Sequence, residues 1–281
     1  MAYATQLVKD VTGFIGWLPY DIIQWDLSQN KLLAKAFFKS KNILFPAEWK
    51  NTKNITSDFV IKSKGGSFGY QVSGPYRDSD DFSLNAHDAS TSNISNAGFA
   101  EQFIEGVNLK VWFWGVKAIY AQHHNYPSVI GDGIQSIHTL IESRLAKAGI
   151  VNVADSDQKN MAAALRFQRL QHADIPYQGC EVWLDFRYGR RYMPATLDAE
   201  TDSDLDQLSL ELTKQIDEVG DAVGQEALHR FKTPMLYSVD GVVDTTGQVW
   251  WLEINSNPML PPEAYPHMFR SLFSLSEKQA A

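Results

Sequence analysis

The sequence predicts an α+β fold built on antiparallel sheets. Strand-like runs come in neighbouring pairs joined by short turns, which is the pattern of antiparallel hairpins. The pairs are residues 57–64 with 70–73, 109–114 with 118–122, and 237–244 with 249–258. Segments with apolar residues at helical spacing are 28–42, 134–141, 150–172 and 207–231. With 281 residues and 44% apolar side chains, the chain can form one large domain or two smaller lobes.

Composition predicts a globular cytoplasmic protein without a nucleic-acid or membrane partner. The formal net charge of -8 argues against a general nucleic-acid binder, although it is compatible with a local basic cleft for phosphates. The single cysteine, Cys180, cannot form an internal disulfide, and we expect it to be buried and inert. Lys9, Asp10 and Asp21 interrupt residues 1–23, so we expect neither a signal peptide nor a transmembrane helix.

The last hairpin carries polar side chains in an unusual place. Residues 249–258 form an apolar run that ends with Glu253 and Asn255 on the same side, because strand side chains repeat every second residue. Asp240 lies in the partner strand, and the turn falls at residues 245–247. Carboxylate and amide oxygens are ligands that Mg²⁺ prefers, so these three side chains are candidate metal ligands. The alternative is that they are ordinary polar groups at the end of a strand.

A second candidate feature is a glycine-rich hairpin behind a lysine-bearing strand. Gly65, Gly66, Ser67 and Gly69 follow the strand of residues 57–64. Glycines allow backbone N–H groups to turn toward phosphate oxygens, and a lysine at the strand end adds positive charge. The loop lacks the residue order and the following helix of a Walker A motif. On its own, such a run is more often a tight hairpin turn.

The helix predicted at residues 28–42 has Ser28 as its candidate N-cap. It carries Lys31 and three later lysines, and we expect those three to form a solvated face. They are Lys35, Lys39 and Lys41. A second cap is expected at Asp132, which precedes the helix of residues 134–141.

Two further segments have weaker patterns. Residues 1–27 show no clear periodicity, and we expect an arm that packs against the body of the protein. Arg187, Arg190 and Arg191 cluster in a loop, which is either a solvated turn or an anion clamp.

Taken in order, the motifs resemble those of the ATP-grasp superfamily. The match is strongest at the Glu-Gln-Phe-Ile-Glu-Gly run from Glu101, the Val-Ile-Gly-Asp-Gly run of residues 129–133, and the hairpin that ends at Pro258. It runs from about residue 30 to residue 262, and it is closest to the branch of cyanophycin synthetase and the ligase part of fused glutathione synthetases. D-alanine-D-alanine ligase is a more distant relative.

The resemblance implies two α/β lobes whose antiparallel sheets sandwich ATP. A small lobe at residues 28–102 would hold the glycine-rich loop, and a large lobe at residues 103–270 would hold the metal site. Residues 1–27 would form an N-terminal arm and residues 271–281 a tail. The arm is too short to form the full α/β domain that precedes the nucleotide-binding part in the family. Either the acceptor is a large molecule or peptide bound on an open face, or a second copy of the chain completes the site.

The resemblance also implies a set of nucleotide contacts. Lys31 and Lys62 match the phosphate-binding lysines, with Lys64 as the alternative to Lys62, and residues 65–69 match the loop that closes over the triphosphate. Glu101 matches the acceptor of the adenine amino group.

The remaining contacts implied by the resemblance concern adenine, ribose and metal. The backbone of Gln102, Phe103 and Ile104 would bind the adenine edge. Asn108 stands where an acidic residue usually binds the ribose, which is a departure. The metal ligands would be Asp240, Glu253 and Asn255, holding two Mg²⁺ ions bridged by Glu253, with Mn²⁺ as the alternative ion.

Two departures fall at the reacting centre. Ser238 stands where relatives of the D-alanine ligase type carry an arginine, and His124 or a neighbour stands where the cyanophycin-like branch carries another. The oxyanion role would then pass to Arg187, Arg190 or Arg191.

The implied activity is that of an ATP- and Mg²⁺-dependent carboxylate-amine ligase acting through an acyl phosphate. Its partners would be a carboxylate and an amine, with a peptide or protein as one form of the acceptor. Two other classes stay open: a kinase on the same fold that phosphorylates a hydroxyl, and a non-catalytic ATP-binding module.

Overall fold

The computed structural model describes residues 2–8, 11–18, 23–50, 55–64, 72–78, 81–82, 98–187 and 203–272. The chain divides into two compact units, and each is described by itself. The first comprises Met1–Phe45, Glu105–His123 and Thr201–Ala281, and the second comprises Pro46–Ile104 and His124–Glu200. The boundaries of these units differ from those of the predicted lobes at residues 28–102 and 103–270. The lobe boundaries stay a prediction. The predicted α+β class with antiparallel sheets is confirmed by the strand pairings within each unit.

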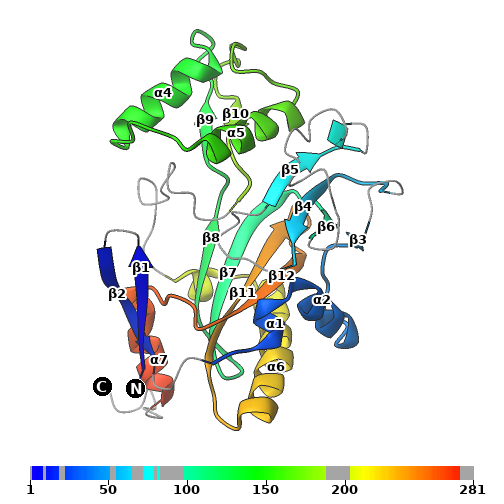
Figure 1. Ribbon diagram of the computed structural model, residues 1–281, viewed down its shortest axis with the longest axis vertical. Helices are drawn as coiled ribbons and strands as arrows, with labels where there is room; N and C mark the ends of the chain where they lie inside the picture. The colour runs from blue at the N-terminus through cyan, green and yellow to red at the C-terminus, as the bar shows by residue number, and fades with distance from the viewer. Residues whose placement is uncertain are drawn as a thin grey trace. The chain divides into compact units, whose positions relative to one another are not determined.

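The first unit is organised around a four-stranded sheet with the order β12-β11-β7-β8 (Figure 1). Strand β11 pairs antiparallel with β7 on one side and with β12 on the other. The bounds are Gly106–Trp114 for β7, Lys117–His124 for β8, Leu236–Asp244 for β11 and Val249–Ser256 for β12. Both hairpins predicted for this part of the chain are therefore present.

The two faces of this sheet have different partners. One face packs its alternate side chains, including Val111 and Val239, against helix α6 (Leu210–Phe231), which follows the short 3-10 helix η2 (Asp204–Gln207). On the other face, Trp112, Trp114 and Leu236 pack against the C-terminal elements η3 (Pro262–Ala264) and α7 (Tyr265–Leu272). The part of this second face that carries charged side chains is the candidate site described below.

Helices α1 (Asp26–Gln29) and α2 (Lys31–Ser40) replace the single helix predicted from residue 28. The N-cap of α2 is Asn30, whose side chain accepts from the Leu32 and Leu33 amides, whereas Ser28 lies inside α1. The expectation of a solvated lysine face holds for Lys39 and Lys41 and is wrong for Lys35, which is 1% exposed with its ammonium 5.3 Å from the Phe45 ring centroid. Upstream, β1 (Ala2–Val8) and β2 (Val11–Leu18) form an antiparallel pair that the sequence did not indicate.

The second unit contains an antiparallel sheet with the order β3-β6-β4-β5. Its strands are β3 (Glu48–Trp49), β4 (Phe59–Ser63), β5 (Val72–Tyr76) and β6 (Gly98–Gln102). Another part of this unit packs α4 (Ile137–Lys147) and α5 (Asp155–Phe167) with the two-stranded pair β9 (Ser128–Ile130) and β10 (Glu181–Trp183).

Two expectations in the second unit need correction. Ser136 caps α4 by accepting from the Thr139 amide at 3.3 Å, and Asp132 instead closes the preceding turn by accepting from the amides of Ile134 and Gln135. Cys180 is half-buried rather than fully buried. None of the helices in the described part of the chain is long and apolar enough to cross a membrane.

The turn between β11 and β12 is organised by Asp244. Its carboxylate accepts from the Thr246 amide and hydroxyl at 2.8 and 2.6 Å, from the Gln248 amide at 3.1 Å, and from the Trp250 indole at 2.8 Å. Desolvation raises the pKa of Asp244, but these hydrogen bonds outweigh it and lower the pKa to about 2. The carboxylate therefore supports the hairpin that carries the candidate metal ligands.

We expect Asp244→Asn to lower the free energy of unfolding at pH 7. The native pKa of about 2 lies below the unfolded value of about 3.9, so the contribution of the carboxylate is present above pH ~4 and is lost as the pH falls toward 2. Urea denaturation at several pH values should show the difference from wild type closing over that range. Asp217→Asn, at an exposed position of α6, controls for loss of a charge alone. A difference that is constant with pH would contradict this role.

Candidate functional site

The first unit carries a row of charged side chains across three neighbouring strands. Lys110 on β7 lies opposite Asp240 on β11, and Asp240 lies opposite Glu253 on β12. Lys110 Nζ is 2.6 Å from Asp240 Oδ1. Since adjacent strands bring such directly opposed side chains together, the row places two carboxylates next to each other with an ammonium at one end.

A β-bulge produces the alignment on β12. The register shifts after the Asp240–Glu253 pair, and Gly241 then faces Trp251, so that Leu252 is the additional residue. Both Trp251 and Ile254 consequently enter the apolar core, although they are three positions apart. Glu253 and Asn255 lie on the opposite face, as predicted from the alternation.

Lys31 supplies the ammonium at the other end of the row, with its Nζ 2.8 Å from Glu253 Oε2. Contacts between the chain's early segment and the end of β12 hold it there. Asn257 makes two hydrogen bonds with the Ile23 backbone, at 2.8 and 3.2 Å, and the Ser28 and Ser256 hydroxyls are 2.7 Å apart. The site therefore depends on packing of α1 and α2 beside β12.

Asn255 completes the cluster by donating from Nδ2 to Asp240 Oδ2 at 3.0 Å. Burial raises the pKa of Asp240, the Lys110 ammonium lowers it, and the neighbouring Glu253 carboxylate raises it again, so the pKa lies above its ordinary value. Two lysines thus neutralise two carboxylates that repel each other.

The donor set fits a divalent cation. It offers one carboxylate from each of two adjacent strands and a carboxamide, which are oxygen ligands of the type that Mg²⁺ prefers. A cation would also relieve the repulsion that raises the pKa of Asp240. Within the described ranges, no three His, Cys, Asp or Glu side chains gather in a metal-binding group, so further ligands would have to be amide or substrate oxygens.

Asn108 lies on the same face, two positions before Lys110 on β7. It is 8% exposed and stands in the row of Val242 and Trp250, next to the charged row. The structure therefore brings five of the predicted residues to one face: Lys31, Asn108, Asp240, Glu253 and Asn255. Sequence reasoning missed Lys110, whose signal was a charged residue in the middle of an otherwise apolar and aromatic strand.

The second unit holds the other predicted pair of charges. Lys62 on β4 and Glu101 on β6 form an ion pair, with side chains 12% and 2% exposed. Both lie away from the apolar cluster that their strand neighbours Ile61 and Ala100 join. The sequence resemblance assigned the two residues to different parts of a nucleotide, and in the structure they are in direct contact.

The stretch that follows Glu101 uses several backbone groups within the unit. The amide of Gln102 donates to Ala47 O and that of Phe103 to Asp58 O, both at 2.8 Å, while Ile104 O accepts from Tyr126 at 3.4 Å. The Phe103 ring packs edge-on against two other phenylalanines, at centroid distances of 5.2 and 5.5 Å. An adenine contact by this backbone stays a prediction.

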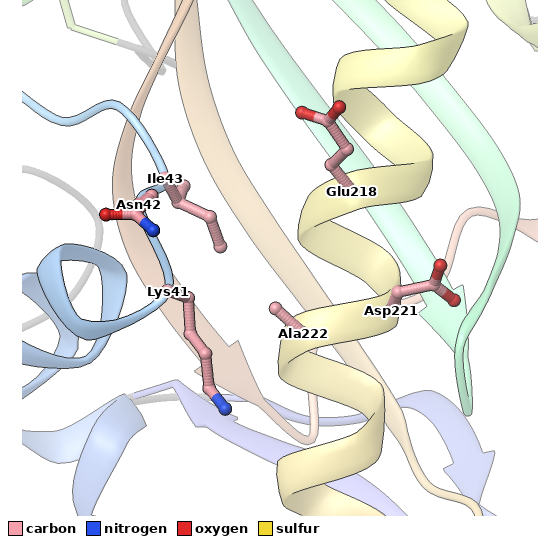
Figure 2. A pocket seen from close by; sticks show the side chains of 6 residues that line it. All are labelled: Lys41, Asn42, Ile43, Glu218, Asp221 and Ala222. Carbon is pink, nitrogen blue, oxygen red and sulfur yellow. The ribbon is translucent and has the colours of Figure 1, made fainter.

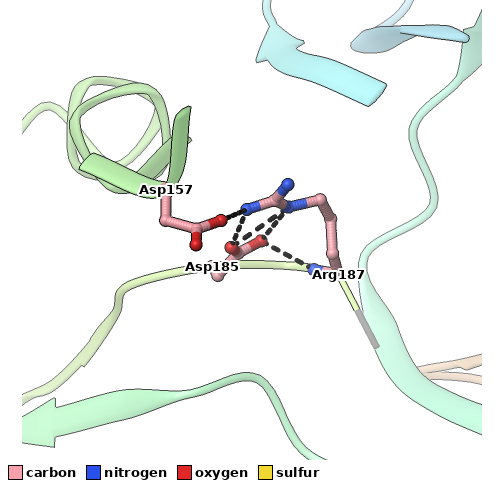
Figure 3. A network of polar contacts seen from close by, with 3 residues as sticks. All are labelled: Asp157, Asp185 and Arg187. Carbon is pink, nitrogen blue, oxygen red and sulfur yellow. Dashed lines mark hydrogen bonds and ion pairs between the residues drawn. The ribbon is translucent and has the colours of Figure 1, made fainter. Parts of the chain in front are cut away.

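Arg187 is held in a buried ion network (Figure 3). Its guanidinium binds Asp185 at 2.6 to 3.1 Å and Asp157 at 3.1 Å, and its side chain is 4% exposed. An oxyanion contact by Arg187 stays a prediction. His124 lies half-buried at the end of β8.

Several predicted residues lie outside the described ranges. They are Gly65, Gly66, Ser67 and Gly69 of the phosphate loop, and Arg190 and Arg191 of the arginine loop.

A cavity of about 510 Å³ in the first unit has none of the charged row's residues in its lining. Figure 2 shows the side chains that line it. It lies between the segment after α2 and helix α6, and it is lined by Lys41, Asn42, Ile43, Glu218, Asp221 and Ala222. Helix α6 packs against the other face of the sheet, so this cavity does not contribute to the candidate site.

We expect Lys110→Met to lower the free energy of unfolding at pH 7 by about 1–3 kcal/mol, because it leaves two carboxylates with one lysine. Without Lys110 the pKa of Asp240 rises further. For an acid whose native pKa exceeds its unfolded value, the penalty is present at neutral pH and is lost as the pH falls through the native pKa. Denaturation between pH 7 and pH 4 should show the deficit shrinking. Lys117→Met, at an exposed position of β8, is the matched control, and an equal deficit in both variants would contradict the role of the row.

No protein-family model and no curated protein matches the chain. Among solved structures, it is similar to the bifunctional glutathione synthetase from Pasteurella multocida, with 14% identity, a TM-score of 0.42, and coverage of 88% of this chain and 36% of that protein. The L-amino acid ligase from Bacillus licheniformis has 10% identity and a TM-score of 0.42, with coverage of 82% and 40%. For the D-alanine–D-alanine ligase from Bacillus anthracis these values are 12%, 0.46, 90% and 70%.

The chain spans 36% and 40% of the length of the first two proteins.

Proposed function

We propose that this chain is an ATP-grasp enzyme that uses ATP and Mg²⁺ to join a carboxylate to an amine through an acyl phosphate. The observation that supports this most directly is the row Lys31–Glu253–Asp240–Lys110 with Asn255 beside Asp240. It combines oxygen donors for a cation with ammonium groups for phosphate on one face of a sheet.

The neutral charge of the row fits a ligand that carries both signs. A magnesium–nucleotide complex brings a cation for the carboxylates and anionic phosphates for the lysines. Each side chain would then exchange one oppositely charged partner for another. Such an exchange avoids leaving a half-buried charge without a partner, which would be costly.

In this proposal, Asp240, Glu253 and Asn255 hold Mg²⁺, which when bound neutralises charge on the transferring phosphoryl group. Lys31 and Lys110 bind phosphate oxygens and orient the terminal phosphate toward the substrate carboxylate. Phosphoryl transfer depends mainly on such positioning and charge neutralisation. Attack by an amine on the acyl phosphate then forms the amide and releases phosphate.

Within the second unit, the chemistry of the Lys62–Glu101 pair also suits a nucleotide contact. A nearly buried carboxylate can accept from an amino group of a base, and the adjacent ammonium can bind a phosphate oxygen. This proposal includes a carboxylate and an amine as substrates, with a peptide or protein as one form of the acceptor. It also includes completion of the acceptor site by a second copy of the chain.

The decisive experiment is a screen of ADP release over amino acids and peptides, with mass spectrometry of the products. An amide together with ADP and phosphate supports the ligase. A stable phosphorylated product supports a kinase, and ATP binding without turnover by any substrate supports a non-catalytic module.

With a substrate pair from that screen, Glu253→Gln should reduce turnover by at least about 100-fold, because removal of one electrostatic group from such a site typically has an effect of this size. The amide can still bond Lys31, so circular dichroism and the unfolding midpoint should stay close to wild type. Glu263→Gln, at an exposed position near the C-terminus, is the matched control. An undiminished rate in Glu253→Gln would refute the assignment of Glu253 to the metal.

Lys62→Ala should weaken ATP binding by about 10- to 150-fold, which corresponds to a charged hydrogen bond of about 1.5–3 kcal/mol. Calorimetry should compare it with Lys64→Ala, which removes the other candidate lysine. Loss only in Lys64→Ala would transfer the role to Lys64, and unchanged affinity in both variants would contradict a phosphate contact by this strand. Because Lys62→Ala also removes the partner of Glu101, folding is checked by circular dichroism.

A further inference from the structure

Ser238 has a buried hydroxyl without a hydrogen-bond partner in the described part of the chain. The residue is 0% exposed, and no protein group among the described residues bonds its Oγ. An unsatisfied buried polar group is costly, and such groups are uncommon in folded proteins. The hydroxyl is therefore a candidate for a hydrogen bond that forms when the site binds a ligand.

The position of Ser238 identifies that partner. On β11 it lies on the same face as Asp240, because Tyr237 and Val239 on either side point into the core against α6. It stands at the border between the apolar half of this face, to which Trp112 belongs, and the charged row. Directly opposite Ser238 on β12 is Asn255.

The Asn255 side chain takes part in two interactions, a hydrogen bond with Asp240 and the proposed contact with a cation. In the structure its Nδ2 donates to Asp240 Oδ2 at 3.0 Å. A cation shared by Asp240 and Asn255 takes an oxygen from each of them. When the Asn255 side chain turns its oxygen toward the cation and its NH₂ group away from the Asp240 carboxylate, the NH₂ group needs another acceptor, because a half-buried donor without a partner is unfavourable.

We propose that the Ser238 hydroxyl is this acceptor, and that Ser238 is a positioning residue which holds the Asn255 amide oxygen toward the cation. Opposed residues on antiparallel strands have Cβ atoms about 4.5–5.5 Å apart, which brings a serine oxygen within reach of an asparagine amide. This inference rests on the proposed metal role of Asp240 and Asn255. Ser238 thus gains its hydrogen bond when the cation binds.

The proposal predicts opposite effects of one substitution in two conditions. Without added Mg²⁺, Ser238→Ala should leave the unfolding midpoint unchanged or slightly higher, because it removes an unsatisfied hydroxyl. With Mg²⁺ and a non-hydrolysable ATP analogue, it should weaken Mg²⁺ binding by about 2- to 10-fold, the effect of one hydrogen bond. The stabilisation that Mg²⁺ adds to the folded protein should fall accordingly.

Ser57→Ala is the matched control. Ser57 also has a buried Oγ without a partner among the described residues, but it lies in the second unit at a position with no proposed role in the site. It should show the same neutral or small positive effect on stability without Mg²⁺, and no change in Mg²⁺ affinity.

A double-mutant cycle tests whether Ser238 acts through Asn255. Calorimetric titration with Mg²⁺ is carried out for wild type, Ser238→Ala, Asn255→Ala and the double variant. Ser238→Ala should weaken Mg²⁺ binding in the wild-type background and have no further effect in Asn255→Ala. An equal effect in both backgrounds, or no effect in either, would overturn the proposal. If Mg²⁺ neither binds nor stabilises the wild type, the proposed metal role itself fails, which is a different outcome.

Discussion

The first unit depends on the balance of charge along one row of side chains. Asp240 and Glu253 lie opposite each other on adjacent strands, where like charges repel. Lys110 approaches from β7 and Lys31 from the start of α2. The row is neutral only when the sheet, the bulge on β12 and the early helices are all in place. The packing of this unit therefore determines which charged side chains meet at the candidate site.

Two sets of charged side chains in the second unit contain predicted site residues, and their surroundings differ. Arg187 has two carboxylate partners in a buried ion network. Lys62 and Glu101 form a nearly buried pair of opposite charges. In the proposed function, a ligand group replaces Glu101 as the partner of Lys62, and another replaces Lys62 as the partner of Glu101.

Local patterns predicted much of the fold, and contacts between distant segments account for what was missed. The hairpins and the shared face of Glu253 and Asn255 follow from alternation within a strand. The bulge that turns Trp251 into the core and the pairing of Lys110 with Asp240 depend on register between strands, which alternation does not determine. Ser28 and Asn30 are both good capping residues, and the break between α1 and α2 at Asn30 decided between them. Lys35 is buried because of how α2 packs.

The hydrogen bonds between Asn257 and Ile23 join residues 234 positions apart. They fix the segment that precedes helix α2, which carries Lys31. During synthesis, Lys31 and the strands of the second unit leave the ribosome before β12 does, because they precede it in the sequence. Contacts at such sequence separation form slowly, because a long loop must be closed before they contribute. We therefore expect the ion pair of Lys31 with Glu253 to form after the β11–β12 hairpin, whose two strands are close in sequence.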